Sequence, residues 1–206
     1  MRDGIFRYWP NRITAARFVG AAVLFVLLAQ FAEFSREALV AERPRIQIAF
    51  WLFILVAASD VLDGWLARRG NHITAFGRIA DPFVDKVLIL GTMIYLAVMP
   101  WSQPWFPAWI VVVILAREFL VTGVRGYVES LGAQFPADGF GKVKMFTQCF
   151  AVGVVIGMFA FEWSPGEFDF WNRVAHFFVW TTLVTSVGSG VTYILKTRRI
   201  LAELAG

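Results

Sequence analysis

Residues 60–85 read DVLDGWLARRGNHITAFGRIADPFVD and place acidic and small residues at regular helical spacing. Asp60, Asp63, Gly64 and Ala67 follow one another at the i, i+3, i+4, i+7 intervals. Residues at these intervals lie on one face of an α-helix. The first part of the stretch therefore predicts a helix with two carboxylates and two small residues on the same face.

The second part repeats this arrangement after a short link. Gly77, Asp81 and Asp85 are spaced four residues apart, so they also share one helix face, with Asp85 about 12 Å beyond Gly77 along the axis. The link over residues 68–76 is long enough to reverse the chain. We therefore expect the two faces to meet and four carboxylates to converge.

The composition places this acidic cluster in a membrane protein. Of the 206 residues, 58% are hydrophobic, and the mean hydropathy is +0.63, whereas soluble domains are about 45–50% apolar. Cys149 is the one cysteine, which excludes an intrachain disulfide. The sequence predicts a single all-α membrane domain over residues 1–206.

A membrane-spanning helix needs about 20 mostly apolar residues, and the chain contains six such segments. The expected spans are Ile13–Phe34, Gln47–Trp65, Gly77–Met99, Ala108–Tyr127, Val143–Phe161 and Val174–Leu195. The first ten residues combine Arg2 and Arg7 with aromatic residues, which favours a short amphipathic helix lying in the interface.

The distribution of positive charge predicts the orientation. If the N-terminus is cytoplasmic, all but four of the 19 Lys and Arg residues fall at the cytoplasmic side, and the exceptions are Arg36, Arg43, Arg45 and Arg173. Cytoplasmic segments of membrane proteins carry the excess of Lys and Arg. We therefore expect an inner-membrane protein whose acidic cluster opens towards the cytoplasm.

Four carboxylates near one membrane surface indicate a metal site. A carboxylate at a helix centre costs about 2.5–3.5 kcal/mol on insertion scales, and neighbouring carboxylates repel one another. Divalent cations remove both problems. Oxygen ligands favour Mg²⁺ or Mn²⁺ over zinc, and two ions about 3.5–4 Å apart suit phosphoryl transfer.

Two non-enzymatic interpretations also account for the acidic residues. The aspartates can line helix ends and pair with arginines in a structural bundle, or they can form the ion site of a transporter or channel. The carboxylates lie near one face and have no counterpart in the second half of the chain, which favours an enzyme open to one side.

The spacing Asp-x2-Asp-Gly-x2-Ala-Arg-x8-Gly-x3-Asp-x3-Asp resembles the signature of the CDP-alcohol phosphatidyltransferase family at all eight positions. The matching residues are Asp60, Asp63, Gly64, Ala67, Arg68, Gly77, Asp81 and Asp85. Residues 10–14, Pro-Asn-Arg-Ile-Thr, followed by Arg17, are similar to the opening of the family's first helix. Six helices preceded by a short amphipathic helix are also the family's plan.

The resemblance implies that an alcohol attacks the phosphate of a CDP-linked alcohol and that CMP leaves. Asp60, Asp63, Asp81 and Asp85 are the implied metal ligands, and Asp85 is the implied general base. The implied CDP-binding residues are Asp60, Asp63, Gly64, Ala67, Arg68 and Gly77. Close helix packing is an alternative reason for the small residues.

The cations of the second half indicate an anionic acceptor. Arg117, Arg125, Lys142 and Lys144 are all expected at the cytoplasmic side. Arginine suits bidentate phosphate binding, whereas snorkelling at helix ends is the alternative for the last three. The segments Ala-Arg-Glu-Phe at 116–119 and Gly-Lys-Val-Lys at 141–144 resemble those of phosphatidylglycerophosphate synthases.

That branch of the family uses CDP-diacylglycerol and glycerol 3-phosphate, which are therefore the expected substrates. Met145 stands where the branch usually has Thr, so relatives that use inositol phosphate, serine or phosphatidylglycerol stay open as alternatives. The expected partners are these substrates and membrane lipids, with no nucleic acid. The family commonly forms homodimers, and the resemblance extends that expectation to this chain.

Overall fold

The computed structural model describes residues 9–70, 75–132 and 139–205, although side chains within 60–79 and at 9, 10, 139, 140, 142 and 203–205 are not described. The described ranges are helical and contain no strand, which confirms the all-α prediction for them. The helices are α1 (Trp9–Ala29), α2 (Arg36–Ala41), α3 (Arg43–Gly70), α4 (Ala75–Val98), α5 (Ala108–Ser130), α6 (Gly139–Ala160) and α7 (Pro165–Ala205).

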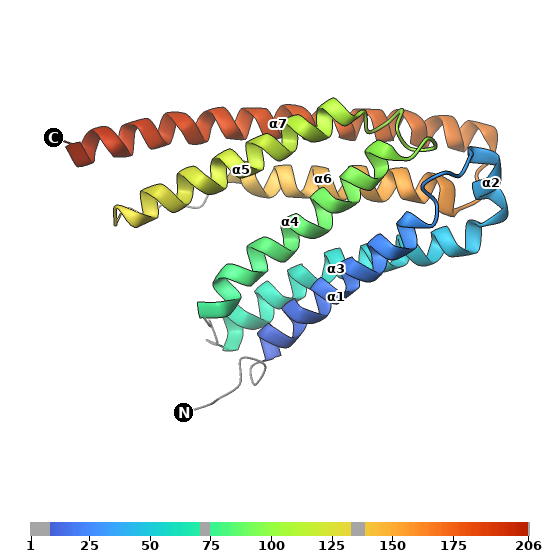
Figure 1. The fold of residues 1–206 in the computed structure, drawn as a ribbon. Helices are drawn as coiled ribbons and strands as arrows, with labels where there is room; N and C mark the ends of the chain where they lie inside the picture. The colour runs from blue at the N-terminus through green and yellow to red at the C-terminus, as the bar shows by residue number, and fades with distance from the viewer. Residues whose placement is uncertain (1–8, 71–74, 133–138, 206) are drawn as a thin grey trace.

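The long helices form two groups. Helix α1 packs against α3 and α4, whereas α7 packs against α5 and α6; α3 and α4 join the two groups through contacts with α6 and α5. The groups meet near α2 and diverge towards the opposite end (Figure 1). We call these the closed end and the open end. The motif-bearing end of α3 and start of α4 lie at the open end.

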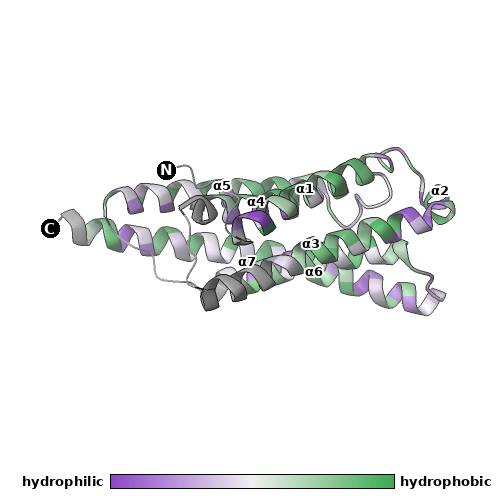
Figure 2. Cartoon of the chain, turned by 90° about the horizontal axis from the view of Figure 1, so that it is seen from below, coloured by the Kyte–Doolittle hydropathy of each residue, from purple (hydrophilic) through white to green (hydrophobic). Residues whose placement is uncertain are grey.

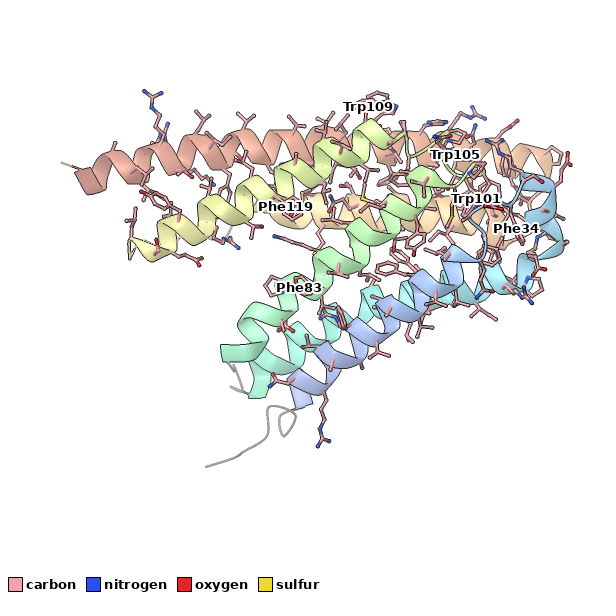
Figure 3. All side chains as sticks on the ribbon, viewed as in Figure 1. Phe34, Phe83, Trp101, Trp105, Trp109 and Phe119 are labelled. Carbon is pink, nitrogen blue, oxygen red and sulfur yellow. The ribbon has the colours of Figure 1, made fainter. Side chains whose placement is uncertain are left out.

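The closed end is held by the connection between α4 and α5. Trp101 Nε1 donates to the carbonyl oxygen of Phe31 at 3.2 Å, and Trp105 Nε1 donates to Asn172 Oδ1 at 2.8 Å. Both tryptophans belong to this connection (Figure 3). Because they bond to α7 and to the segment after α1, the two helix groups are tied together at this end.

Helix α1 approaches its neighbours closely through glycines. A Cβ atom added at Gly20 would lie 2.7 Å from Val56 Cγ2, and one added at Gly91 would overlap the ring of Phe25. Small residues allow helices in membranes to approach one another in this way. The resulting contact fixes α1 beside both motif-bearing helices.

Three described helices are long and apolar enough to cross a membrane, namely Asn11–Ala29, Val143–Ala160 and Pro165–Ala202. Large apolar side chains such as Leu55 and Phe119 are exposed, and hydrophobic residues predominate along the middle of the helices (Figure 2). The chain is therefore a membrane protein. The membrane crossing of α3, α4 and α5 stays a prediction, because α4 and α5 carry more charged residues and the side chains at the end of α3 are not described.

The structure corrects the expected boundaries at both ends of the chain. The first helix ends at Ala29 rather than Phe34, and the short helix α2, capped by Ser35, follows it. The last helix begins at Pro165 rather than Val174 and runs for 41 residues, about 60 Å. The N-terminal interfacial helix expected over the first ten residues lies largely outside the described residues.

Ser164 and Glu167 explain the early start of α7. Glu167 Oε2 accepts hydrogen bonds from the Ser164 amide at 2.8 Å and from the Ser164 hydroxyl at 2.7 Å. Pro165 follows Ser164 directly, and proline is favoured at the first position of a helix. This reciprocal cap begins the helix ahead of its apolar part.

Candidate active site

The two acidic segments lie on helices that contact each other and share α1 as a neighbour. Asp60 and Asp63 belong to the last part of α3, and Asp81 and Asp85 to the first part of α4. This backbone arrangement agrees with the predicted return of the chain. The side chains of Asp60, Asp63, Gly64, Ala67, Arg68 and Gly77 lie outside the described ones, so their convergence stays a prediction.

The two described aspartates both bond to α1. Asp81 accepts a hydrogen bond from the hydroxyl of Thr14, and Asp85 forms an ion pair with Arg17. Asn11, Thr14 and Arg17 are at most 3% exposed. Helix α1 therefore presents a buried polar face to the carboxylates, and Arg17 balances the charge of Asp85.

A cavity of about 180 Å³ adjoins Asp85 between α4, α5 and α6. Its wall combines charged and polar side chains with apolar ones. The lining residues are Pro82, Asp85, Lys86, Ile89, Leu90, Glu118, Gly141, Lys144, Met145 and Gln148. A small polar molecule in this cavity would lie beside the carboxylate that the sequence predicts as the base.

Glu118 is the centre of a charged network in the cavity wall. It is 5% exposed, and its carboxylate accepts from Arg117 at 2.7 Å and from Lys144. Lys86 Nζ lies 3.9 Å from the second carboxylate oxygen. Three cations thus surround one buried carboxylate. Lys86 and Lys144 line the cavity, whereas Arg117 is not among the described lining residues.

Helix α7 positions Arg117 within this network. Arg117 donates a 2.6 Å hydrogen bond to Ser189 Oγ. A Cβ at Gly190 would lie 3.0 Å from Arg117 Cγ, closer than ordinary packing allows. Ser189 therefore orients the guanidinium group, and Gly190 provides the space for its stem.

The predicted acceptor residues are brought together only in part. Arg117 and Lys144 meet at Glu118, whereas Arg125 stacks over Tyr193 and donates to its hydroxyl at 3.0 Å. Arg125 is not part of the described cavity wall. The side chain of Lys142 is not described, so its role stays a prediction.

Several polar residues of this region were not predicted as site residues from the sequence. Lys86 and Gln148 line the cavity, and Thr14 and Arg17 contact the aspartates. For α1 the sequence does contain such a signal, because Asn11, Thr14 and Arg17 recur at helical spacing and share one helix face. Gln148 lies one helical turn after Lys144, which is a weaker signal.

The described donor set fits hard divalent cations. Asp81 and Asp85 supply carboxylate oxygens one turn apart, the kind of ligand that Mg²⁺ or Mn²⁺ prefers, and in this structure these oxygens contact Thr14 and Arg17. The described side chains alone contain no group of three or more His, Cys, Asp or Glu residues able to hold an ion. A complete site would need Asp60 and Asp63 of α3.

Comparisons with known proteins show similarity over most of this chain's length. The chain is 32% identical over 191 residues to a CDP-diacylglycerol–glycerol-3-phosphate 3-phosphatidyltransferase of Bacillus subtilis, covering 91% of this chain and 93% of that protein. It is 33% identical to the protein of the same name in Rickettsia felis, over 71% of this chain and 74% of the relative. A CMP-forming cardiolipin synthase of Streptomyces coelicolor is 30% identical, over 93% of this chain and 83% of that protein.

The family-level comparison covers both the acidic stretch and the cavity. The sequence model of the CDP-alcohol phosphatidyltransferases matches residues 7–188, which include α1, both motif-bearing helices and every residue of the cavity wall. The chain therefore belongs to the CDP-alcohol phosphatidyltransferase family.

Proposed function

We propose that this enzyme transfers the phosphatidyl group of CDP-diacylglycerol to glycerol 3-phosphate, giving phosphatidylglycerophosphate and CMP. The observation that carries the proposal is the cavity beside Asp85, whose wall contains Lys86 and Lys144 of the cationic network around Glu118. Relatives that cover most of this chain are named for this reaction. Family membership favours an enzyme over the transporter and structural-bundle alternatives.

The proposed metal site uses Asp60, Asp63, Asp81 and Asp85. Two Mg²⁺ or Mn²⁺ ions bound there would neutralise the charge that develops on the transferring phosphate. Asp81 and Asp85 are oriented by Thr14 and Arg17, so α1 holds them before any ligand binds. Preorganised ligands of this kind lose little entropy when an ion enters.

The cytidine nucleotide is assigned to the α3 side of the site. Gly64 and Ala67 offer a helix surface without bulk, and Arg68 offers a positive charge to a phosphate. Gly77 stands at the start of α4, opposite this surface in the proposed arrangement. The lipid-bearing phosphate then lies between the aspartates, with the acyl chains in the membrane.

The acceptor is assigned to the cavity on the other side of Asp85. Glycerol 3-phosphate carries a phosphate dianion, which matches the surplus of two positive charges around Glu118. With the phosphate at Lys86, Arg117 and Lys144, the free primary hydroxyl lies towards Asp85. Holding both groups in reacting positions supplies much of the rate enhancement expected for such an enzyme.

In the proposed step, Asp85 takes the proton of the primary hydroxyl. The hydroxyl oxygen forms a bond to the lipid-bearing phosphorus, and the bond from that phosphorus to the oxygen of CMP breaks. The electron pair of the broken bond leaves with CMP. A general base in hydrogen-bond reach of the nucleophile contributes about 10²–10⁴-fold to such a reaction.

We further propose that the open end faces the cytoplasm. The closed end, where α2, the start of α3 and the start of α7 lie, carries Arg36, Arg43, Arg45 and Arg173, the four cations that the sequence predicts on the opposite side. This orientation follows the positive-inside rule and gives water-soluble glycerol 3-phosphate access to the cavity.

A panel of acceptors tests the proposed substrate. The purified enzyme, supplied with CDP-diacylglycerol and Mg²⁺ or Mn²⁺, should convert glycerol 3-phosphate in preference to serine, inositol phosphate or phosphatidylglycerol, with the lipid product identified by mass spectrometry. The Streptomyces relative makes phosphatidylglycerol the most relevant competitor. Preferred use of another acceptor would reject the acceptor assignment and leave the family's chemistry in place.

Replacing Arg117 by Ala should weaken acceptor binding. Arg117 is held against Glu118 and Ser189, so its loss removes one charged hydrogen-bonding group from the proposed phosphate site. Charged hydrogen bonds contribute about 1.5–3 kcal/mol, which corresponds to roughly 10–150-fold in KM for glycerol 3-phosphate. Steady-state kinetics should show a much smaller change for CDP-diacylglycerol.

Arg173→Ala is the matched control for this change, because Arg173 lies at the closed end and bonds to the carbonyl oxygen of Asp169 in its own helix. The Arg173→Ala enzyme should keep the wild-type KM values for glycerol 3-phosphate and for CDP-diacylglycerol. An Arg117→Ala enzyme with weakened CDP-diacylglycerol binding and an unchanged KM for glycerol 3-phosphate would place Arg117 on the donor side instead.

Replacing Glu118 by Gln should destabilise the protein and make its stability depend on the acceptor. The variant leaves Lys144, Arg117 and Lys86 without the buried carboxylate that separates their charges. Loss of one partner from a buried ion pair costs about 3–5 kcal/mol. The melting temperature in detergent should therefore fall, and glycerol 3-phosphate should restore more of it than in the wild type.

Glu129→Gln provides the comparison, because Glu129 is exposed and pairs only loosely with Arg125 at 3.9 Å. Its melting temperature should stay within a degree or two of the wild type, since exposed pairs contribute about 0–1 kcal/mol. Equal melting temperatures for the Glu118 and Glu129 variants would show that Glu118 does not hold the cations together.

A further inference from the structure

Gln148 is a buried polar residue in the cavity wall to which the reaction above assigns no task. It lies on α6, one turn beyond Lys144 and further from the open end. The side chain is 4% exposed, and its Nε2 atom has no hydrogen-bond partner among the described residues. Buried polar groups in proteins are almost always paired, so the amide is expected to bond to a group that enters the cavity, either water or a ligand.

The other unpaired buried atoms have simpler explanations. Thr182 Oγ1 and Ser186 Oγ belong to hydroxyl groups on α7, which can turn towards a carbonyl oxygen of their own helix. The unpaired Nε atoms of Arg117 and Arg43 belong to guanidinium groups that are held through their terminal nitrogens, and neither residue lines the cavity. Within the described cavity wall, Gln148 is the residue whose buried nitrogen lacks a partner.

The chemistry of the amide selects one group of the proposed acceptor. The phosphate dianion only accepts hydrogen bonds, and the proposed function assigns it to Lys86, Arg117 and Lys144. The primary hydroxyl is assigned to Asp85. The remaining polar group of glycerol 3-phosphate is its C2 hydroxyl, which both donates and accepts. A carboxamide also does both, and rotation about its last torsion exchanges its oxygen and nitrogen at little cost.

We infer that Gln148 binds the C2 hydroxyl of the acceptor and thereby selects glycerol 3-phosphate over phosphorylated alcohols that lack this group. The inference rests on the proposed function. It assigns three contacts to the acceptor: cations at the phosphate, Asp85 at the primary hydroxyl and Gln148 at the C2 hydroxyl. An acceptor without the C2 hydroxyl leaves the buried amide unpaired, and sites of this kind discriminate strongly against such analogues.

The test compares glycerol 3-phosphate with 3-hydroxypropyl phosphate, which has the same phosphate and primary hydroxyl but no C2 hydroxyl. The wild-type enzyme should prefer glycerol 3-phosphate by about 10–100-fold in kcat/KM, the range of one hydrogen bond lost from a buried site. Gln148→Met keeps the length of the side chain and removes the amide. It should lose activity with glycerol 3-phosphate and keep or gain activity with the analogue, so that the preference falls to nearly one.

Gln103→Met is the control, because Gln103 is exposed in the connection at the closed end. It should keep the wild-type preference. Equal losses on both acceptors in the Gln148 variant, or an unchanged preference, would overturn the inference and reduce Gln148 to a structural residue. A wild type without preference for the C2 hydroxyl would overturn it even if the variant failed to fold. A wild type that transfers to neither acceptor would instead reject the proposed function.

Discussion

Replacing Asp60 or Asp81 by Ala is expected to abolish turnover while the protein remains folded in detergent. Each carboxylate is proposed to bind metal that neutralises the charge of the transferring phosphate, an effect of several kcal/mol. Since 1.36 kcal/mol corresponds to a tenfold change, kcat should fall to about one thousandth or less. The measurement is CMP release from CDP-diacylglycerol by each purified variant.

Folding is expected to survive the change at Asp81 because its described partner is a neutral hydroxyl. Without the carboxylate, Thr14 can turn its hydroxyl towards its own helix backbone. Asp169→Ala, at the exposed start of α7, should retain full turnover and serves as control. Undiminished turnover in the Asp60 or Asp81 variant, or full activity after exhaustive chelation, would reject the metal mechanism.

Replacing Asp85 by Asn is expected to lower kcat by about 10²–10⁴-fold, the contribution of a general base. The amide keeps the shape of the side chain but cannot take the proton of the acceptor. Binding of CDP-diacylglycerol should survive better than turnover, because the α3 residues assigned to the nucleotide are unchanged. Single-turnover kinetics and equilibrium binding of CDP-diacylglycerol separate the two effects.

The same substitution leaves Arg17, which is 3% exposed, without its described acidic partner. Part of any loss could therefore be structural, and the melting temperature has to be measured alongside. Asp169→Asn tests the chemical change itself at an exposed position. Turnover near the wild-type rate in a folded Asp85→Asn enzyme would show that Asp85 is not the base.

Much of the helical architecture could be predicted from hydropathy and helix-breaking residues. The expected spans Gln47–Trp65 and Ala108–Tyr127 lie within α3 and α5, because a continuous apolar stretch forms each helix core. The full lengths of the helices were harder to predict from the sequence. Helix α7 extends well beyond its apolar part because the Ser164–Glu167 cap begins it and its polar end continues past the expected span.

The predicted end of the first helix was wrong for a related reason. Residues 30–34 are partly apolar, so hydropathy extended the helix to Phe34, whereas the chain turns after Ala29 and α2 begins after the Ser35 cap. Local hydrogen bonds decide such boundaries. Phe31 also offers its carbonyl oxygen to Trp101, a contact with the connection before α5 that hydropathy does not encode.

The candidate site also has features that the sequence predicts and features that depend on the packing of the helices. The relation between Asp81 and Asp85 follows from their spacing on one helix, whereas the pairing of Arg117 with Glu118 is known from the structure. The roles of Lys86, Ser189 and Gln148 depend on which helices become neighbours across the bundle. Spacing within one segment cannot provide that information, and here it comes from the packing of α4, α5, α6 and α7.

The central claim is phosphatidyl transfer from CDP-diacylglycerol to glycerol 3-phosphate at a metal-bound carboxylate site. The most direct test follows CMP and phosphatidylglycerophosphate in the same reaction of the purified enzyme. The two products should appear in equal amounts, only when glycerol 3-phosphate and Mg²⁺ or Mn²⁺ are both present, and should stop on chelation and resume when the ion is restored. Continued formation of both products after exhaustive chelation, or release of CMP without a matching amount of phosphatidylglycerophosphate, would contradict this account.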